Sequence, residues 1–139
     1  MSTNIELLEE FGNVRRSLGR MAVQYGRDLK IGPKQLVAIR FIGKKKKCTM
    51  AEIAEGTNSD KASVTRIINS LVETGWLERQ FGTEDRRQIV ITLSVEGARK
   101  IPKIEKIYSI IAERFASSLN AKEQKELLQL FTKIKQGLS

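Results

Sequence analysis

Apolar residues near the start of the chain recur at alternating intervals of four and three, at Leu7, Phe11, Val14, Leu18, Met21 and Tyr25. This spacing predicts an amphipathic helix whose apolar stripe forms a seam for another helix. The helix is expected to end before Gly32 and Pro33, because the residue before a proline is disfavoured in the α region. The pattern leaves open whether the stripe packs within its own subunit or against a second copy of the chain.

A second helix is predicted from residue 33 to residue 41 or 42, since proline suits the first helical position and apolar residues then repeat at helical spacing. Gly43 is expected to end this helix. The lysine run from Lys44 to Lys47 would then form a charged loop. We interpret that loop as a solvated connection, with a phosphate contact as the alternative.

The next stretch has the pattern of two helices joined by a tight turn. Thr49 and Glu52 match a capping box, in which each side chain accepts from the other residue's backbone N–H, so a short helix should run to about Glu55. The polar residues 56–59 interrupt it, and Ser59 or Asp60 can cap a longer helix. The sequence therefore predicts a helix-turn-helix.

The longer helix has two different faces. Its apolar face follows the i, i+3, i+4, i+7, i+8 pattern, at Val64, Ile67, Ile68, Leu71 and Val72. Its other face has only small, polar or cationic side chains, at Lys61, Ala62, Ser63, Thr65, Arg66, Asn69 and Ser70. No acidic residue occurs between Asp60 and Glu73 to repel phosphates. This face suits close approach to the major groove of DNA.

A β-hairpin is expected after this helix. Gly75 can end the helix in a left-handed conformation, and Trp76 is interpreted as a core residue. A strand is predicted from about residue 77 to residue 80 or 81, then a polar tip over residues 82–85, then a strand in which apolar and other residues alternate to residue 93.

The end of the hairpin carries Asp85, Arg86 and Arg87. An acidic residue beside two arginines favours an ion pair that would orient one guanidinium, although such a surface pair contributes less than about 1 kcal/mol. Because the hairpin directly follows a helix-turn-helix, we interpret it as a DNA-contacting wing.

The remaining residues predict two further helices. The first begins near Ser94, contains Pro102 near its start, and has apolar residues at helical spacing. The second is opened by Asn120 with Glu123. These helices have more apolar surface than a small winged domain needs, so together with the first helix they suggest a dimer platform. The residues expected at the dimer interface are Leu7, Phe11, Val14, Leu18, Phe131 and Ile134.

Composition narrows the classes of function. The 139 residues are 40% apolar and 29% charged with two prolines, which fits one globular, mainly helical unit. The net charge of +9 favours a polyanionic partner, but the basic residues are spread along the whole chain and identify no site. No stretch approaches the roughly 20 apolar residues of a membrane span, and the acidic N-terminus does not resemble a secretory signal, so a cytoplasmic protein is expected.

The chain contains no histidine and a single cysteine, Cys48. A tetrahedral zinc site of the usual Cys/His kind cannot be built from these residues, and catalysis that uses histidine as a base is excluded. Phosphate-binding GxxxxGK[ST] and GxGxxG motifs are also missing from the sequence. We therefore expect no enzyme, no cofactor and no metal, and we interpret Cys48 as a small buried apolar residue.

Several segments in this order resemble the MarR family of bacterial regulators. The helix-turn-helix pattern is matched by residues 51–54 (AEIA) and 60–68 (DKASVTRII), and the helix end and strand by residues 71–79 (LVETGWLER). The wing is matched by residues 84–87 (EDRR) and the next helix start by residues 93–97 (LSVEG). Trp76, the lysine run, Thr57 and Ser59 depart from the family pattern.

The resemblance implies a mainly α fold with a small two-stranded β-wing: a winged helix-turn-helix whose N- and C-terminal helices form a dimerisation platform. It divides the chain into an N-terminal dimerisation helix (1–32), a winged DNA-binding domain (33–93) and C-terminal dimerisation helices (94–139). The helix from Asp60 would enter the major groove, and Arg87, oriented by Asp85, would reach the minor groove.

The implied function is a homodimeric regulator, a repressor in the first instance, that binds a pseudo-palindromic operator in double-stranded DNA and is released by a small-molecule effector in the crevice between platform and winged domain. Two alternatives from other classes remain. A winged-helix protein-interaction module without DNA binding would be favoured by a neutral or acidic recognition face, and a small carboxylate enzyme would need an acidic pair on a common apolar-lined face, which we do not find in the sequence.

Overall fold

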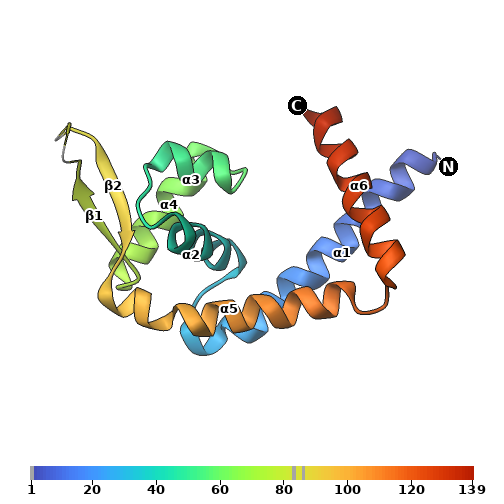
Figure 1. Ribbon diagram of the computed structural model, residues 1–139, viewed down its shortest axis with the longest axis horizontal. Helices are drawn as coiled ribbons and strands as arrows, with labels where there is room; N and C mark the ends of the chain where they lie inside the picture. Colours follow the sequence, from blue (N-terminus) through green and yellow to red (C-terminus); the bar gives the residue numbers. More distant parts are fainter. Residues whose placement is uncertain (1, 83, 86) are drawn as a thin grey trace.

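The computed structural model describes residues 2–82, 84, 85 and 87–139. Its elements in chain order are α1 (Thr3–Gly26), a 3-10 turn (Arg27–Leu29), α2 (Pro33–Lys45), α3 (Met50–Gly56), α4 (Lys61–Glu73), β1 (Leu77–Phe81), β2 (Ile89–Leu93), α5 (Val95–Ala116) and α6 (Ala121–Leu138). Figure 1 shows an elongated molecule with the strands at one end and both termini at the other. The long helix α5 runs along one edge and joins the two ends, and the expected mainly helical fold with a two-stranded wing is confirmed.

The winged part, residues 33–93, forms a continuous apolar core together with α5 and the end of α1. Strands β1 and β2 pair antiparallel, with Leu77 opposite Leu93 and Phe81 opposite Ile89. Cys48 joins the other edge of β2 through two backbone hydrogen bonds with Ile91, of 2.8 and 3.1 Å. The largest side chains in this core are fully buried and come from α2, α3, α4, both strands and α5, namely Ile39, Ile42, Ile53, Ile68, Leu71, Leu77, Ile91 and Ile104.

Local capping accounts for most helix starts. The Thr49 N–H donates to Oε1 of Glu52 over 2.9 Å and the Glu52 N–H donates to Oγ1 of Thr49 over 3.1 Å, which confirms the predicted capping box. Asn120 and Glu123 make the same reciprocal pair at the start of α6. These bonds satisfy backbone donors that the first turn of a helix leaves without a partner.

The prediction that Gly43 ends α2 is wrong. The helix continues to Lys45 and ends at Lys46, whose φ of 72° is left-handed. Gly43 instead allows α2 to lie close to α5, because a β-carbon at this position would come within 3.2 Å of Cδ1 of Ile101. Lys44 and Lys45 therefore belong to the last turn of the helix, where cations oppose the negative end of its dipole, and do not form a loop.

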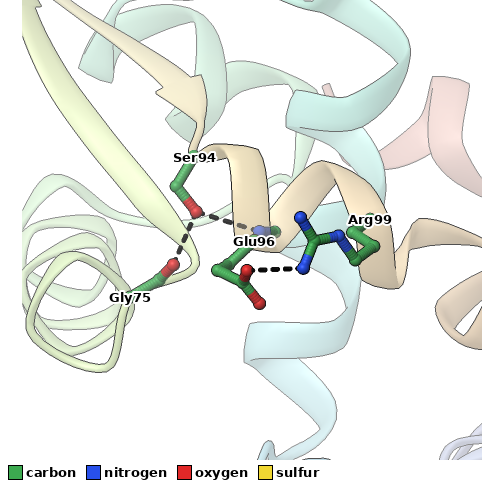
Figure 2. A network of polar contacts seen from close by, with 5 residues as sticks. Gly75, Ser94, Glu96 and Arg99 are labelled. Carbon is green, nitrogen blue, oxygen red and sulfur yellow. Dashed lines mark hydrogen bonds and ion pairs between the residues drawn. The ribbon is translucent and has the colours of Figure 1, made fainter.

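Ser94 connects the winged part to α5 (Figure 2). Its hydroxyl donates to the carbonyl of Gly75 over 2.6 Å and accepts from the N–H of Gly97 over 2.9 Å, so one side chain caps α5 and holds the end of α4. Gly97 approaches so closely that a β-carbon there would lie 2.2 Å from the carbonyl oxygen of Trp76. As expected, Gly75 has a positive φ of 90° and Trp76 is buried.

Candidate nucleic-acid interface

Helix α4 presents the predicted polar face to solvent. Val64, Ile68 and Leu71 are buried against the core, and the opposite side of the helix consequently points outward. Among the residues singled out from the sequence, two are half-buried, Ser63 and Ser70, and the others are exposed: Lys61, Ala62, Thr65, Arg66 and Asn69.

The first turn of α4 is held by Asp60. Its carboxylate accepts from the backbone N–H of Ser63 over 2.8 Å and from the Ser63 hydroxyl over 2.9 Å. These hydrogen bonds hold the pKa of the Asp60 carboxyl below its usual range. Nη2 of Arg66 donates to the same Ser63 hydroxyl over 3.3 Å, so Ser63 already has partners on both sides. Asp60, Ser63 and Arg66 thus form one ordered polar group at the start of the helix.

Arg79 on β1 is a functional candidate that the sequence reasoning did not single out. Its guanidinium Nη2 donates to Oδ1 of Asn69 on α4. The signal was present, because alternation along β1 places Arg79 on the same side of the strand as the buried Leu77. The contact adds a cation beside the predicted face of α4 and occupies the Asn69 carbonyl.

One arginine of the wing, Arg87, is almost fully exposed to solvent. Nε of Arg87 lies 3.5 Å from Oδ1 of Asp85, and the Arg87 backbone N–H donates to the same oxygen over 3.0 Å. The ion pair expected between these residues is therefore present, although the Arg87 side chain remains 94% exposed. Arg86, also expected at the wing, lies outside the described residues.

The residues expected at a dimer interface are poorly covered by their own chain. Leu7, Phe11, Val14 and Ile134 are exposed, and Leu18 and Phe131 are half-buried. Helix α6 contains no buried residue. Apolar side chains of this size on two helices leave a surface that the single chain does not bury.

A cavity of about 560 Å³ lies between α1, α2 and α5. Its wall is mainly apolar and includes Leu36, Tyr108 and Phe115, whereas the charged residues that line it, Arg15, Arg16 and Lys34, are all cationic. Arg40 lies next to it, with its guanidinium 4.1 Å from the centre of the Tyr108 ring and its Nε 3.2 Å from Oε1 of Glu105. The cavity therefore combines apolar walls with positive charge.

Cys48 lies in the core of the winged part, as expected for a small apolar residue. Burial raises the pKa of its thiol to about 11, and the nearby Glu52 carboxylate acts in the same direction. Among the described residues, no cluster of three or more cysteine, aspartate or glutamate side chains is arranged to hold a metal ion. Within the same part of the chain, no helix has the length and apolar character needed to cross a bilayer.

Comparisons with known proteins show which proteins the chain is similar to. The MarR family model matches residues 29–88, from the end of the 3-10 turn to the wing. The HTH-type transcriptional regulator BilQ of Clostridium symbiosum is 28% identical over 99 residues, which cover 71% of this chain and 69% of that protein. Over its winged part, the chain is similar to the MarR family. It spans between 60% and 70% of the length of the curated relatives that it matches.

Solved MarR-family structures have the same fold. A mutant of the E. coli MarR protein complexed with operator DNA superposes with a TM-score of 0.85 and 24% identity, covering 94% of each chain. BpsR of Bordetella bronchiseptica, a protein whose DNA binding is regulated by 6-hydroxynicotinic acid, superposes with a TM-score of 0.87 and 18% identity, covering 97% of this chain and 96% of its own. MarR-family proteins are transcriptional regulators and not enzymes, in agreement with the function class expected from the sequence.

Proposed function

We propose that the chain is a transcription repressor that binds a pseudo-palindromic operator in double-stranded DNA as a homodimer and is released by a small-molecule ligand. The observation that carries the proposal is the presence of two basic surfaces on one folded unit: the outward face of α4, without acidic residues between Asp60 and Glu73, and the exposed Arg87 of the wing. An α-helix fits the major groove, and a narrow wing can reach the adjacent minor groove. A protein that binds operator DNA must lie in the same compartment as the DNA, so we also propose a cytoplasmic location.

Individual contacts follow from the geometry of α4. Lys61 and Arg66 are the strongest candidates for guanine edges or phosphates, because both donate hydrogen bonds and both are exposed. The small residues Ala62 and Thr65 allow the helix backbone to approach the bases. Ser63 acts mainly by orienting Arg66, since its hydroxyl already binds Asp60 and Arg66.

Two further contacts are proposed outside the helix face. Arg79 lies beside Asn69 and would bind a phosphate at the edge of the major groove, because a guanidinium matches phosphate geometry. Arg87 would enter the minor groove while Asp85 limits its directions. Asn69 then contributes by holding Arg79.

The homodimer is proposed from the uncovered apolar side chains of α1 and α6. Residues 1–32 and 94–139 would form the platform, and residues 33–93 would form the DNA-binding unit. Two-fold symmetry of the dimer would place the two α4 helices about one turn of DNA apart, roughly 34 Å, and would require a pseudo-palindromic operator.

The effector is proposed to be an aromatic carboxylate or a related anion. The cavity between α1, α2 and α5 offers Tyr108 and Phe115 to an aromatic ring and Arg15, Arg16 and Lys34 to a negative charge. Benzoate and 6-hydroxynicotinic acid are suitable probes. Each should weaken DNA binding by the wild-type protein, and Lys34→Ala should need a higher concentration of the same probe.

The test of DNA binding is selection of bound duplexes from a random pool, followed by affinity measurements over a range of salt concentrations. We expect an enriched sequence with two inverted half-sites, and a steep loss of affinity with salt, with a slope of about −0.9 per neutralised phosphate. If no duplex is enriched and the affinity does not depend on salt, the chain is a protein-interaction module and the proposed function is wrong.

The wing is tested by Arg87→Ala on the selected duplex. Loss of one specific contact should cost on the order of 1 to 3 kcal/mol of binding free energy without altering the dimer. Lys122→Ala, which removes one exposed cation at the start of α6, is the matched control for the change in net charge. Equal affinities of the two variants for the duplex would show that the wing does not contact DNA.

A further inference from the structure

The wing carries an exposed apolar pair that the functions described so far do not use. Phe81 at the end of β1 is 75% exposed and Ile89 at the start of β2 is 43% exposed. The register makes them direct cross-strand partners. Two apolar residues opposite each other on an exposed part of the sheet form a small patch that suits contact with another molecule.

The direction of the patch follows from strand alternation. Leu77, Arg79 and Phe81 lie on one side of β1, and of these Leu77 is buried in the core while Arg79 donates to Asn69 of α4. This side of the sheet therefore faces α4. Phe81 lies two residues farther toward the tip, about 7 Å along an antiparallel strand, where α4 no longer covers the sheet.

The patch is bounded by cations on both sides. Arg79 lies on the side of α4, and Arg87, paired with Asp85, lies toward the tip. A protein that places α4 in the major groove and Arg87 in the minor groove must straddle the single sugar-phosphate strand between the two grooves. Along the wing, the apolar pair lies between Arg79 on β1 and Arg87 at the tip, on the side of the sheet that faces α4.

We propose that Phe81 and Ile89 pack against the deoxyribose rings of the strand that separates the two grooves, while Arg79 binds an adjacent phosphate. The inference rests on the proposed DNA-binding function and deepens it. A deoxyribose ring presents C–H groups that an aromatic face can cover, and the flanking phosphates complement the flanking arginines. The contact positions the wing and contributes affinity that is independent of salt.

The two halves of this contact respond differently to ionic strength. Arg79→Ala removes one neutralised phosphate in each subunit of the dimer, so the slope of log affinity against log salt should become shallower by about two units. Phe81→Ala removes apolar contact only, so affinity should fall by about fivefold at every salt concentration with the slope unchanged. A salt titration therefore separates the apolar contact from the ionic one.

The test compares Phe81→Ala, Phe81→Leu and Gln80→Ala on the selected duplex. Phe81→Leu keeps an apolar side chain and should lose less than about half as much binding free energy as Phe81→Ala. Gln80→Ala changes a neighbouring exposed residue on the other side of the strand and should bind like the wild type. Thermal unfolding should be similar for all three, because these side chains are exposed.

Each outcome decides between occupants of the patch. Equal affinities of Phe81→Ala and Gln80→Ala would overturn the proposal while leaving DNA binding by the wild type intact. A change in the size of the DNA-free assembly in sedimentation experiments on Phe81→Ala would instead assign the patch to a second copy of the chain. If the wild type binds no duplex, the proposed function and this inference both fail.

Discussion

Helices α4 and α6 are both amphipathic and capped, yet only α4 has its apolar face buried by the rest of its own chain. Ile68 in the middle of α4 is 0% exposed, whereas Leu128 on α6 is 68% exposed and none of the residues of α6 is buried. An isolated helix of this length is marginal in water without tertiary packing. The difference shows that the core around α4 is completed within one chain, whereas the apolar residues of α6 are left uncovered, as the proposed dimer requires.

The same contrast divides α1 along its length. Ala22 and Gly26 near its end are buried, and Gly26 packs so tightly that a β-carbon would come within 2.6 Å of the carbonyl oxygen of Ile31. Leu7, Leu8 and Phe11 near its start are exposed. The end of α1 therefore belongs to the folded core, and its start belongs with α6 to the surface that we assign to the dimer.

The largest effect is expected from a charge in the uncovered region. Phe11→Asp should dissociate the dimer, because an unpaired carboxylate is costly to bury in an apolar interface. Loss of the second half-site contact should lower affinity for the selected duplex by about 10² to 10⁴-fold. Sedimentation and DNA titration measure the two changes. Phe11→Leu is the matched control and should keep both properties, and a monomeric wild type would contradict the comparison directly.

A second effect distinguishes the two regions by how strongly unfolding depends on protein concentration. Ile68→Ala removes a fully buried side chain from the winged core and should cost about 2 to 5 kcal/mol of unfolding free energy at any protein concentration. Ile134→Ala in α6 should lower the unfolding temperature most at low protein concentration, where the dimer dissociates. Thermal scans over a dilution series test this. Similar concentration dependence for both variants would erase the distinction between the regions.

A smaller effect is expected on the stability of the fold at acidic pH. Hydrogen bonds from Ser63 lower the pKa of Asp60 in the folded protein relative to the ordinary value of 3.8. The contribution of Asp60 to stability is therefore present above its ordinary pKa and is lost as the pH falls through the lower folded-state pKa. Asp60→Asn keeps a good helix cap that does not titrate, so unfolding of the variant should depend less steeply on pH in this acid range. Identical acid unfolding curves would mean that the Asp60 cap is not formed.

Local features of the fold could be predicted because they depend on neighbouring residues. The capping residues Thr49, Asp60 and Asn120 and the left-handed Gly75 all act within a few positions, and the structure has each of them. Helical periodicity likewise identified the buried face of α4. These signals were sufficient for the winged fold and for the surface on which the candidate site lies.

Features that depend on contacts between distant residues could not be predicted from the sequence. Glycine commonly ends helices, but Gly43 lies inside α2. Its role there depends on the close approach of Ile101 on α5, which is nearly sixty residues away in the sequence. The Arg79–Asn69 hydrogen bond and the shape of the cavity between α1, α2 and α5 also depend on how elements pack in three dimensions. Phe81 lies on the same side of β1 as the buried Leu77, and only the structure shows that its side chain is exposed.

The smallest effect is expected at Cys48, where the self-sufficient core should protect the thiol. With a pKa of about 11, only roughly one thiol in ten thousand is a thiolate at pH 7, and the thiolate is the reactive form. Modification by a thiol reagent should therefore be slow in the native protein and fast in denaturant, and hydrogen peroxide should leave DNA binding unchanged. Cys48→Ala is the control, because it should bind DNA like the wild type. Rapid oxidation of the native protein with loss of DNA binding in the wild type, but not in Cys48→Ala, would show that the winged core opens to solvent and is less complete than its burial indicates.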